Sequence, residues 1–151
     1  MVCAAASSAA TPPVIASAAK TSPLETAPDL YQIVRAASTS LSVTATDDGG
    51  ESLLKYTWSK VSGPTGTVTF SVNGTNAAKN STATFQAAGD YTLSVTAQDV
   101  PGLSVTSSVN VRVVQTVGSL VLNPPTATLA VNATQAFTAT LLDQFSQTMA
   151  G

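Results

Sequence analysis

The sequence predicts an all-β protein: an immunoglobulin-like antiparallel β-sandwich of about seven strands, followed by a partial second β-sandwich. Three observations predict this fold. Apolar residues alternate with Ser and Thr over residues 41–46, 91–97 and 103–113. Clusters of Gly, Pro, Asn and Asp interrupt that alternation at spacings of roughly 8–12 residues. Nothing between residues 41 and 114 shows the 3.6-residue period of a helix.

The first forty residues carry the weakest pattern. Residues 1–13 are rich in Ala, Ser and Thr and end in two prolines, which is typical of a flexible lead-in. A short first strand is expected at Val14-Ile15. Residues 20–39 contain two more prolines and little periodicity, so a loop with a turn around Leu30-Tyr31 is expected there. Ile33-Val34 would then pack onto the sandwich.

The central strands are predicted from period-two alternation. Residues 41–46 form the first clear strand, and the next one places Tyr56 and Trp58 on a single face. Alternation over residues 68–72 ends at Asn73-Gly74, a dipeptide that favours tight turns. Further strands are expected at residues 83–85, 91–97 and 103–113, separated by turns at 88–90 and 99–102.

A second pattern of alternation begins after the boundary near Thr116-Gly118. Leu120 and Leu122 share one parity, short apolar pieces follow around Leu129 and Val131, and Phe137, Ala139 and Leu141 are expected to face inward on a later strand. Three strands are too few to close a sandwich. We therefore expect residues 117–151 to be the truncated start of a second domain, which packs on residues 14–116 or remains partly unfolded.

The amino-acid composition limits the classes of molecule that the protein can bind. Hydrophobic residues make up 44% of the 151 residues, enough to build a core, whereas only 9% are charged and the net charge is −2. The six basic residues are scattered, so the clustered cations that nucleic-acid binding needs are missing. Apolar runs are shorter than the ~18 residues of a membrane span, and we expect no membrane insertion.

The sequence also lacks the usual groups for catalysis. Histidine is absent and Cys3 is the single cysteine, so neither an intrachain disulfide nor a Cys/His metal site can form. Serine and threonine residues have no histidine to activate them, and no Ser-x-x-Lys motif or phosphate-binding glycine loop occurs. We expect a protein that is not an enzyme and needs no cofactor.

One acidic cluster is a candidate calcium site. Asp47, Asp48 and Glu51 follow the strand at 41–46, and Asp99 follows the strand at 91–97. The loops after the second and sixth strands of a seven-strand sandwich emerge at the same end, so these carboxylates can converge on Ca²⁺. The alternative is that Asp and Gly act there only as turn formers.

Two aromatic residues have structural and functional interpretations. Trp58 lies on an inward parity, which favours core packing, and a sugar-stacking platform is the functional alternative. Tyr91 follows Gly89-Asp90 at the start of a strand, where a tyrosine corner would bond its hydroxyl to a nearby backbone group.

Residues 54–114 resemble the PKD (polycystic kidney disease) type of immunoglobulin-like domain. The resemblance is carried by Leu54-Lys55-Tyr56-Thr57-Trp58, by the Gly-x-Tyr-x-Leu-x-Val pattern that starts at Gly89, and by the strand at 104–114. The sequence departs from the family after Trp58, where residues 60–64 replace a frequent Gly-Asp-Gly turn. Residues 120–151 are similar to the start of a bacterial immunoglobulin-like (Big) domain, through Pro124 and the run at 133–139.

These resemblances imply a function. Tandem modules of these two families occur in large exported bacterial proteins, as spacers beside enzymatic or sugar-binding domains or in adhesins. They imply a non-catalytic structural or interaction module, located outside the cell or on its surface, whose partners are neighbouring domains of the same polypeptide. A carbohydrate-binding or adhesion module that contacts polysaccharide or a cell-surface protein is the alternative, although the eight aromatic residues fall mostly on inward parities.

Overall fold

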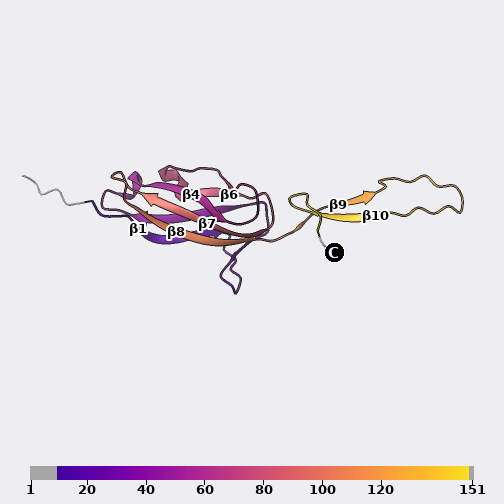
Figure 1. Cartoon of the computed structure of the whole chain (residues 1–151), viewed down its shortest axis with the longest axis horizontal. Helices are drawn as coiled ribbons and strands as arrows, with labels where there is room; N and C mark the ends of the chain where they lie inside the picture. Colours follow the sequence, from indigo (N-terminus) through magenta and orange to yellow (C-terminus); the bar gives the residue numbers. More distant parts are fainter. Residues whose placement is uncertain (1–9, 150–151) are drawn as a thin grey trace, which may run out of the picture.

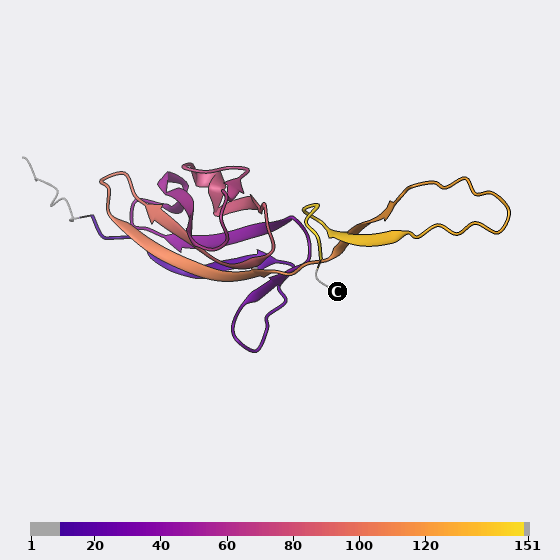
Figure 2. The same ribbon diagram turned by 45° about the vertical axis from the view of Figure 1, so that its right-hand side comes forward.

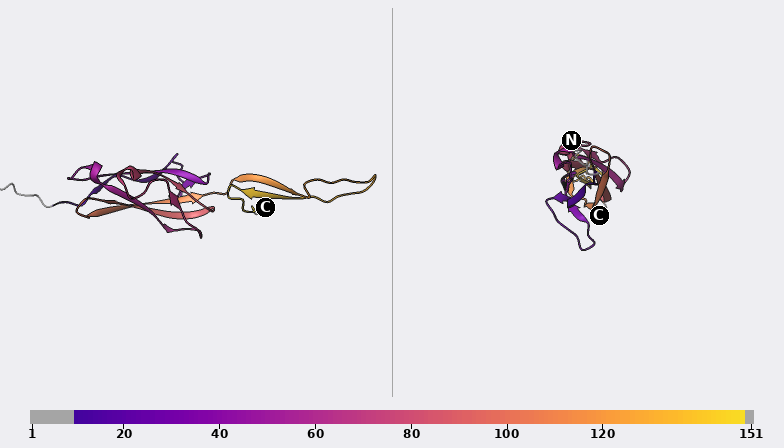
Figure 3. Two further views of the ribbon diagram at one scale, coloured as in Figure 1. Left: turned by 90° about the horizontal axis from the view of Figure 1, so that it is seen from above. Right: turned by 90° about the vertical axis from the view of Figure 1, so that its left-hand side faces the viewer.

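The computed structural model describes residues 10–149 of the chain. Two β-sheets pack face to face into a sandwich, and a separate two-stranded hairpin extends from one end of it, so that the molecule is long and narrow (Figures 1 and 3). The fold is all-β and antiparallel, as the alternation predicts. No helix among residues 10–149 is long and apolar enough to cross a bilayer.

The sandwich has four strands in each sheet. One sheet has the order β1-β3-β6-β5 and the other has the order β2-β8-β7-β4. Neighbouring strands are antiparallel, except that β2 runs parallel to β8. The strands are β1 (Val14–Ser22), β2 (Gln32–Val34), β3 (Ser38–Thr46), β4 (Lys55–Ser62), β5 (Thr69–Phe70), β6 (Asn80–Thr84), β7 (Gly89–Gln98) and β8 (Ser104–Val113), with 3-10 helices η1 (Glu51–Leu53) and η2 (Asn76–Lys79).

The beginning of the sandwich differs from the sequence prediction. The first strand does not stop at Val14-Ile15 but continues to Ser22, and residues 32–34 within the expected loop form β2. The register of β1 against β3 shifts twice, between Ile15 and Ser17 and again before Lys20, and these shifts hide the period-two pattern. Residues 10–13 of the predicted lead-in lie outside the strands, and residues 1–9, with Cys3, lie outside the described part of the chain.

The core is built from alternate residues of the facing strands. Trp58 is 2% exposed, its ring stacks on Phe70 at 6.3 Å between centroids, and its Nε1 donates to Ala78 O at 2.8 Å. Its buried indole therefore has a hydrogen-bond partner as well as apolar neighbours. Around it the inward side chains of three strands are almost fully buried: Leu41, Val43 and Ala45 of β3, Tyr56 of β4, and Tyr91, Leu93, Val95 and Ala97 of β7.

Two side-chain hydroxyls link the sheets close to the register shifts between β1 and β3. Ala45 N donates across the sandwich to the hydroxyl of Tyr56, at 3.1 Å. Ala19 N donates to Ser107 Oγ of β8 at 3.0 Å. Because a buried N–H without a partner costs free energy, both bonds stabilise the sandwich, and the bond from Ala19 holds β1 against β8.

The open edge of β4 is covered by the segment around Asn73: the backbone of Gly74 and Thr75 bonds to Tyr56, and the Asn73 side chain bonds to Trp58. Asn73 Oδ1 accepts from Trp58 N at 2.7 Å, and Asn73 Nδ2 donates to Trp58 O at 3.0 Å. The amide thus bonds to Trp58 as the backbone of a neighbouring strand would. The Asn73-Gly74 dipeptide therefore lies in a bend that protects an edge, rather than in a two-residue hairpin.

The strand predicted over residues 68–72 is shorter than expected. The strand ends at Phe70. Beyond it the Ser81 hydroxyl, instead of a neighbouring strand, bonds to the backbone of Val72: it accepts from Val72 N and donates to Val72 O. Val72 consequently lies at the surface, and its predicted inward position is wrong.

The hairpin beyond the sandwich consists of β9 (Val117–Asn123) and β10 (Thr138–Asp143). Leu120 pairs with Leu141 and Leu122 with Ala139, so the apolar residues share one face, as the parity predicts. The prediction that Phe137, Ala139 and Leu141 face inward is wrong, because all three are exposed, as are Leu120 and Leu122. The pieces around Leu129 and Val131 form no strand.

We predict that Asn73→Ala lowers the free energy of unfolding by about 1–3 kcal/mol, because both backbone groups of Trp58 lose their partner. Urea unfolding followed by the fluorescence of Trp58, the single tryptophan, measures the change. The matched control is Asn80→Ala, which removes an exposed amide and should change stability by less than about 0.5 kcal/mol. Equal effects of the two substitutions would contradict the edge-covering role of Asn73.

Candidate functional site

The four acidic residues of the predicted calcium site lie at one end of the sandwich. Asp47 and Asp48 directly follow β3, and Glu51 opens η1, which leads into β4. Asp99 directly follows β7, whose last residue pairs with the first residue of β4. The prediction that the two loops emerge at the same end is therefore correct.

The carboxylates do not form a common cluster. Asp47 Oδ2 accepts from Gly49 N at 3.0 Å, which is turn chemistry. Asp99 Oδ1 accepts from the backbone N–H groups of Gly102 and Leu103 at 2.8 and 2.7 Å, and so shapes the β7–β8 loop. In the described range, no group of three or more His, Cys, Asp or Glu side chains is placed to hold a metal ion.

Glu51 is the centre of a different network. Its carboxylate accepts from Lys79 Nζ at 3.0 and 3.1 Å and from the Tyr56 hydroxyl at 3.1 Å. Asn76 Nδ2 donates both to Glu51 Oε1 and to Glu51 O. The network joins η1 to η2 at the end of the core.

Two opposing effects set the pKa of Glu51. Partial burial acts to raise it, but hydrogen bonds from Lys79, Asn76 and Tyr56 outweigh burial, and the pKa of Glu51 is lowered. Burial raises the pKa of the Tyr56 hydroxyl. Tyr56 therefore stays protonated and acts as the donor to Glu51.

We predict that Glu51→Gln destabilises the protein near neutral pH by about 1 kcal/mol or less, since 35% of the Glu51 side chain is exposed. A carboxylate whose pKa is lowered by folding contributes stability above its unfolded pKa and loses that contribution as pH falls through the folded value. The difference between wild type and variant should therefore be constant above about pH 6 and shrink below about pH 4.5. Urea unfolding at several pH values measures it, and a difference that grows in acid would contradict the ion pair.

Asp47 keeps one carboxylate oxygen, Oδ1, that is buried and has no hydrogen-bond partner among residues 10–149. A single such oxygen falls far short of the six to eight oxygen ligands that Ca²⁺ takes. We therefore predict that the thermal midpoint is the same in millimolar CaCl₂ and in EDTA. A rise with calcium that Asp47→Asn abolishes, while Asp48→Asn keeps it, would instead establish a cation site at this oxygen.

The two aromatic residues hold structural positions. Tyr91 Oη donates to Ala87 O at 2.8 Å, which confirms the predicted tyrosine corner. The Tyr91 ring packs on the Phe85 ring, with 4.8 Å between the two ring centroids. Gly63 lies close against the Tyr91 ring, because a Cβ added at Gly63 would be 2.5 Å from a ring atom of Tyr91. The sugar-stacking alternative for Trp58 is wrong, because the ring is buried in the core.

An arginine that sequence reasoning missed holds the loop between β1 and β2. Arg112 donates to both carboxylate oxygens of Asp90 at 2.6 and 2.8 Å and pairs with Asp29 at 2.7 Å. Its guanidinium lies 4.5 Å from the centre of the Tyr31 ring. Hydrogen bonds and charge from Asp90 and Asp29 raise the pKa of Arg112, and Arg112 lowers the pKa of Asp90, so the pair of Arg112 and Asp90 stays charged.

This loop, residues 23–31, projects from the side of the sandwich (Figure 2). Arg35 pairs with Glu25 at its base at 2.8 Å. Leu30 near its tip has a φ of 68° and is exposed. The sequence pattern alone does not indicate the Arg112 clamp, because Asp29 and Arg112 are far apart in the chain and come together only through the parallel pairing of β2 with β8.

We predict that Arg112→Ala releases the loop without unfolding the sandwich. Amides that bond within the loop, those of Ala27, Leu30 and Ile33, should exchange with solvent several-fold faster, whereas the β7 amides should not change. Arg112→Lys should give an intermediate result, because lysine keeps the charge but loses the two-pronged geometry. Unchanged exchange in the loop of Arg112→Ala would contradict the clamp.

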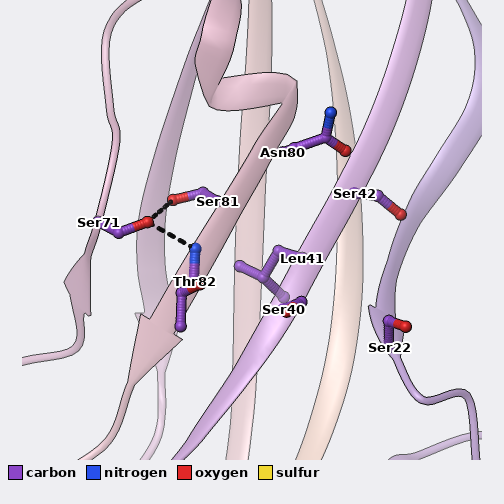
Figure 4. Close-up of a pocket in the computed structure, with 8 residues that line it drawn as sticks. All are labelled: Ser22, Ser40, Leu41, Ser42, Ser71, Asn80, Ser81 and Thr82. Carbon is purple, nitrogen blue, oxygen red and sulfur yellow. Dashed lines mark hydrogen bonds between the residues drawn. The ribbon is translucent and has the colours of Figure 1, made fainter.

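The outer side of the β1-β3-β6-β5 sheet carries a polar hollow of about 410 Å³ (Figure 4). Its side chains are hydroxyls and one amide, with a single apolar residue and no charge. Such a surface offers hydrogen bonds to a neutral ligand but no ring on which a sugar can stack. The lining residues are Ser22, Ser40, Leu41, Ser42, Ser71, Asn80, Ser81 and Thr82.

Comparisons with known proteins agree with this architecture. The family model described as "K319L-like, PKD domain" matches residues 30–113. A solved structure of a nucleoside hydrolase-related hypothetical protein from Saccharophagus degradans, described as associated with carbohydrate metabolism, is similar with a TM-score of 0.50 and 21% identity. The match covers 69% of this chain and 26% of that one, and at this identity it shows the fold alone. No curated protein matches the sequence.

Proposed function

Because the chain belongs to the K319L-like PKD domain family, we propose that it is a non-catalytic spacer in a large exported or cell-surface bacterial protein. The family assignment indicates a structural or interaction module that forms part of a larger polypeptide. Beyond that assignment, we infer that the module is non-catalytic, lies outside the cell or on its surface, and acts as a spacer. Its main partners are then the neighbouring domains of the same polypeptide.

The path of the chain is the observation that carries the proposal. The chain enters the sandwich at Val14, at the end where β3 stops, and leaves it at Val113, at the opposite end. The hairpin continues outward from there along the same long axis (Figures 1 and 3). A module with its entry and exit at opposite ends separates whatever is attached to them, which is what a spacer does.

The way in which polar side chains are used also supports a spacer. The charged groups of Glu51, Lys79 and Arg112 hold structural elements of the sandwich together. Outward positions of β7 and β8 carry mainly Ser, Thr and Asn. A neutral hydroxylated surface of this kind gives weak electrostatic attraction to other molecules.

The hairpin segment is part of the same proposal, as the first piece of a second immunoglobulin-like domain. A two-stranded ribbon with one apolar face is marginal in water by itself. Met149 N donates to Leu141 O at 2.9 Å and Thr148 bridges to Leu142, so the chain after β10 turns back and lies along the outer edge of β10 as a third strand would. Further strands of such a domain would cover Leu120, Leu122 and Leu141.

Carbohydrate binding is the second candidate, and the hydroxyl-lined hollow on the β1-β3-β6-β5 sheet is the observation that favours it. Hydroxyl and amide groups match a neutral sugar. The hollow has no aromatic residue, and stacking on aromatic rings supplies much of the contact area in binding sites of this kind. The spacer therefore remains the stronger candidate.

Affinity electrophoresis in gels that contain polysaccharides separates the two functions. We predict that the chain migrates equally fast with and without polysaccharide. The matched variants are Ser40→Leu, which fills the hollow, and Tyr31→Ala, which removes the aromatic ring beside Arg112. Retardation of the wild type that Ser40→Leu removes and Tyr31→Ala preserves would replace the spacer with a carbohydrate-binding function.

A further inference from the structure

We propose that the turn after β10 is a latch that couples the hairpin segment to the folding of the sandwich. The latch consists of Asp143, which ends β10, and of Gln144 and Phe145 in the turn, and it contacts Val114–Gly118 and the core of the sandwich. Its binding partner is the base of a preceding PKD-type sandwich. The inference goes beyond the role of spacer, because it concerns how the stability of one module depends on the next.

Gln144 makes the central contacts of the latch. Its side-chain Nε2 donates to Val114 O at 2.8 Å, and its Oε1 accepts from Thr116 N at 2.8 Å. Its backbone N donates to Thr116 O at 3.1 Å. Three hydrogen bonds from one residue therefore fix the segment that connects β8 to β9.

Asp143 sets the shape of the turn. The residue is 3% exposed, and its Oδ1 accepts from the backbone N–H groups of Phe145 and Gln147 at 2.8 and 2.9 Å. Its Oδ2 accepts from Gln115 Nε2 at 3.2 Å, in the connecting segment. The backbone hydrogen bonds help to lower the pKa of Asp143 against the opposing effect of burial. The carboxylate thus stays charged and holds both parts of the latch.

Phe145 makes the apolar contact. It is partly buried and packs against the core of the sandwich, although it belongs to the hairpin segment. Within the part of that segment that the structure describes, no other hydrophobic residue packs against this core. The core is thereby extended by a side chain that lies 32 residues after the end of β8, from Val113 to Phe145.

The backbone at Gly118 is also adapted to the latch. A Cβ placed on Gly118 would lie 2.5 Å from Asp143 O and 2.9 Å from Asp143 C. Any other residue would therefore push the turn away from β9, because backbone atoms cannot give way as the end of a flexible side chain does. Thr116 adds a bond to the sandwich itself, since its Oγ1 donates to Arg35 O at 3.2 Å.

The turn that follows β3 in the sandwich has the same hydrogen-bond pattern as the turn after β10, but it lacks the apolar side chain of the latch. After β3, Asp47 accepts through its side chain from Gly49 N and through its backbone O from Gly50 N, as Asp143 accepts from Phe145 N and Ser146 N. Gly49 stands where the hairpin has Phe145. The apolar side chain that reaches the core is thus an addition to a turn that both segments share.

Equilibrium unfolding of the full chain in urea tests the latch, with Trp58 as a reporter that lies only in the sandwich. Phe145→Ala should shift the Trp58 transition to lower urea, because the core loses a contact supplied by the other segment. Phe137→Ala is the matched control: it removes an exposed phenylalanine of the same segment that makes no contact with the core. It should leave the Trp58 transition unchanged.

A second pair of variants distinguishes loss of the latch contacts from a general disturbance of the hairpin. Gln144→Ala should shift the Trp58 transition in the same direction as Phe145→Ala, and Phe145→Leu should restore most of the wild-type midpoint. If Phe145→Ala and Phe137→Ala give the same Trp58 transition, or if Phe145→Leu is no better than Phe145→Ala, the latch is overturned.

Discussion

The structure depends on the interlocking of two sheets whose alternate side chains fill one core. Period-two burial on β3, β4, β7 and β8 removes large apolar side chains from water, and this is the main favourable contribution to folding. Trp58 lies within this core and reaches across to η2 through its indole N–H. The charged networks and loops are held in place by strands that this burial aligns.

Burial also means that backbone N–H and C=O groups at the edges of the two sheets need hydrogen-bond partners. Such groups occur on β1, β3 and β4, where side chains supply the bonds: Ser107 to Ala19, Tyr56 to Ala45 and Asn73 to Trp58. Because a single cysteine excludes an intrachain disulfide, hydrogen bonds of this kind are important for holding the strands together. The same use of polar groups for structure supports the proposed role as a spacer.

Features that depend on residues close together in the chain could be predicted from the sequence, and features that depend on distant residues could not. The strands around Val43 and Val95 were predictable because their neighbours along the chain show the alternation. The Arg112 clamp was not, because its partners meet only after β2 crosses to the second sheet. Leu120 and Leu141 do pair on one face of the hairpin, but Leu141 is exposed, because no second sheet covers that face in the described residues. The acidic residues were correctly predicted to lie at one end of the sandwich. The carboxylates of Asp47 and Asp99, however, accept hydrogen bonds from nearby backbone N–H groups.

The fluorescence of the native chain tests the interlocked core most directly, since the sequence contains one tryptophan. A Trp58 ring that is 2% exposed should emit at shorter wavelength than in the unfolded chain and should be quenched only weakly by acrylamide. Emission at the wavelength of the unfolded chain, with full access to acrylamide, would mean that Trp58 stands in water and that the two sheets do not enclose a common core.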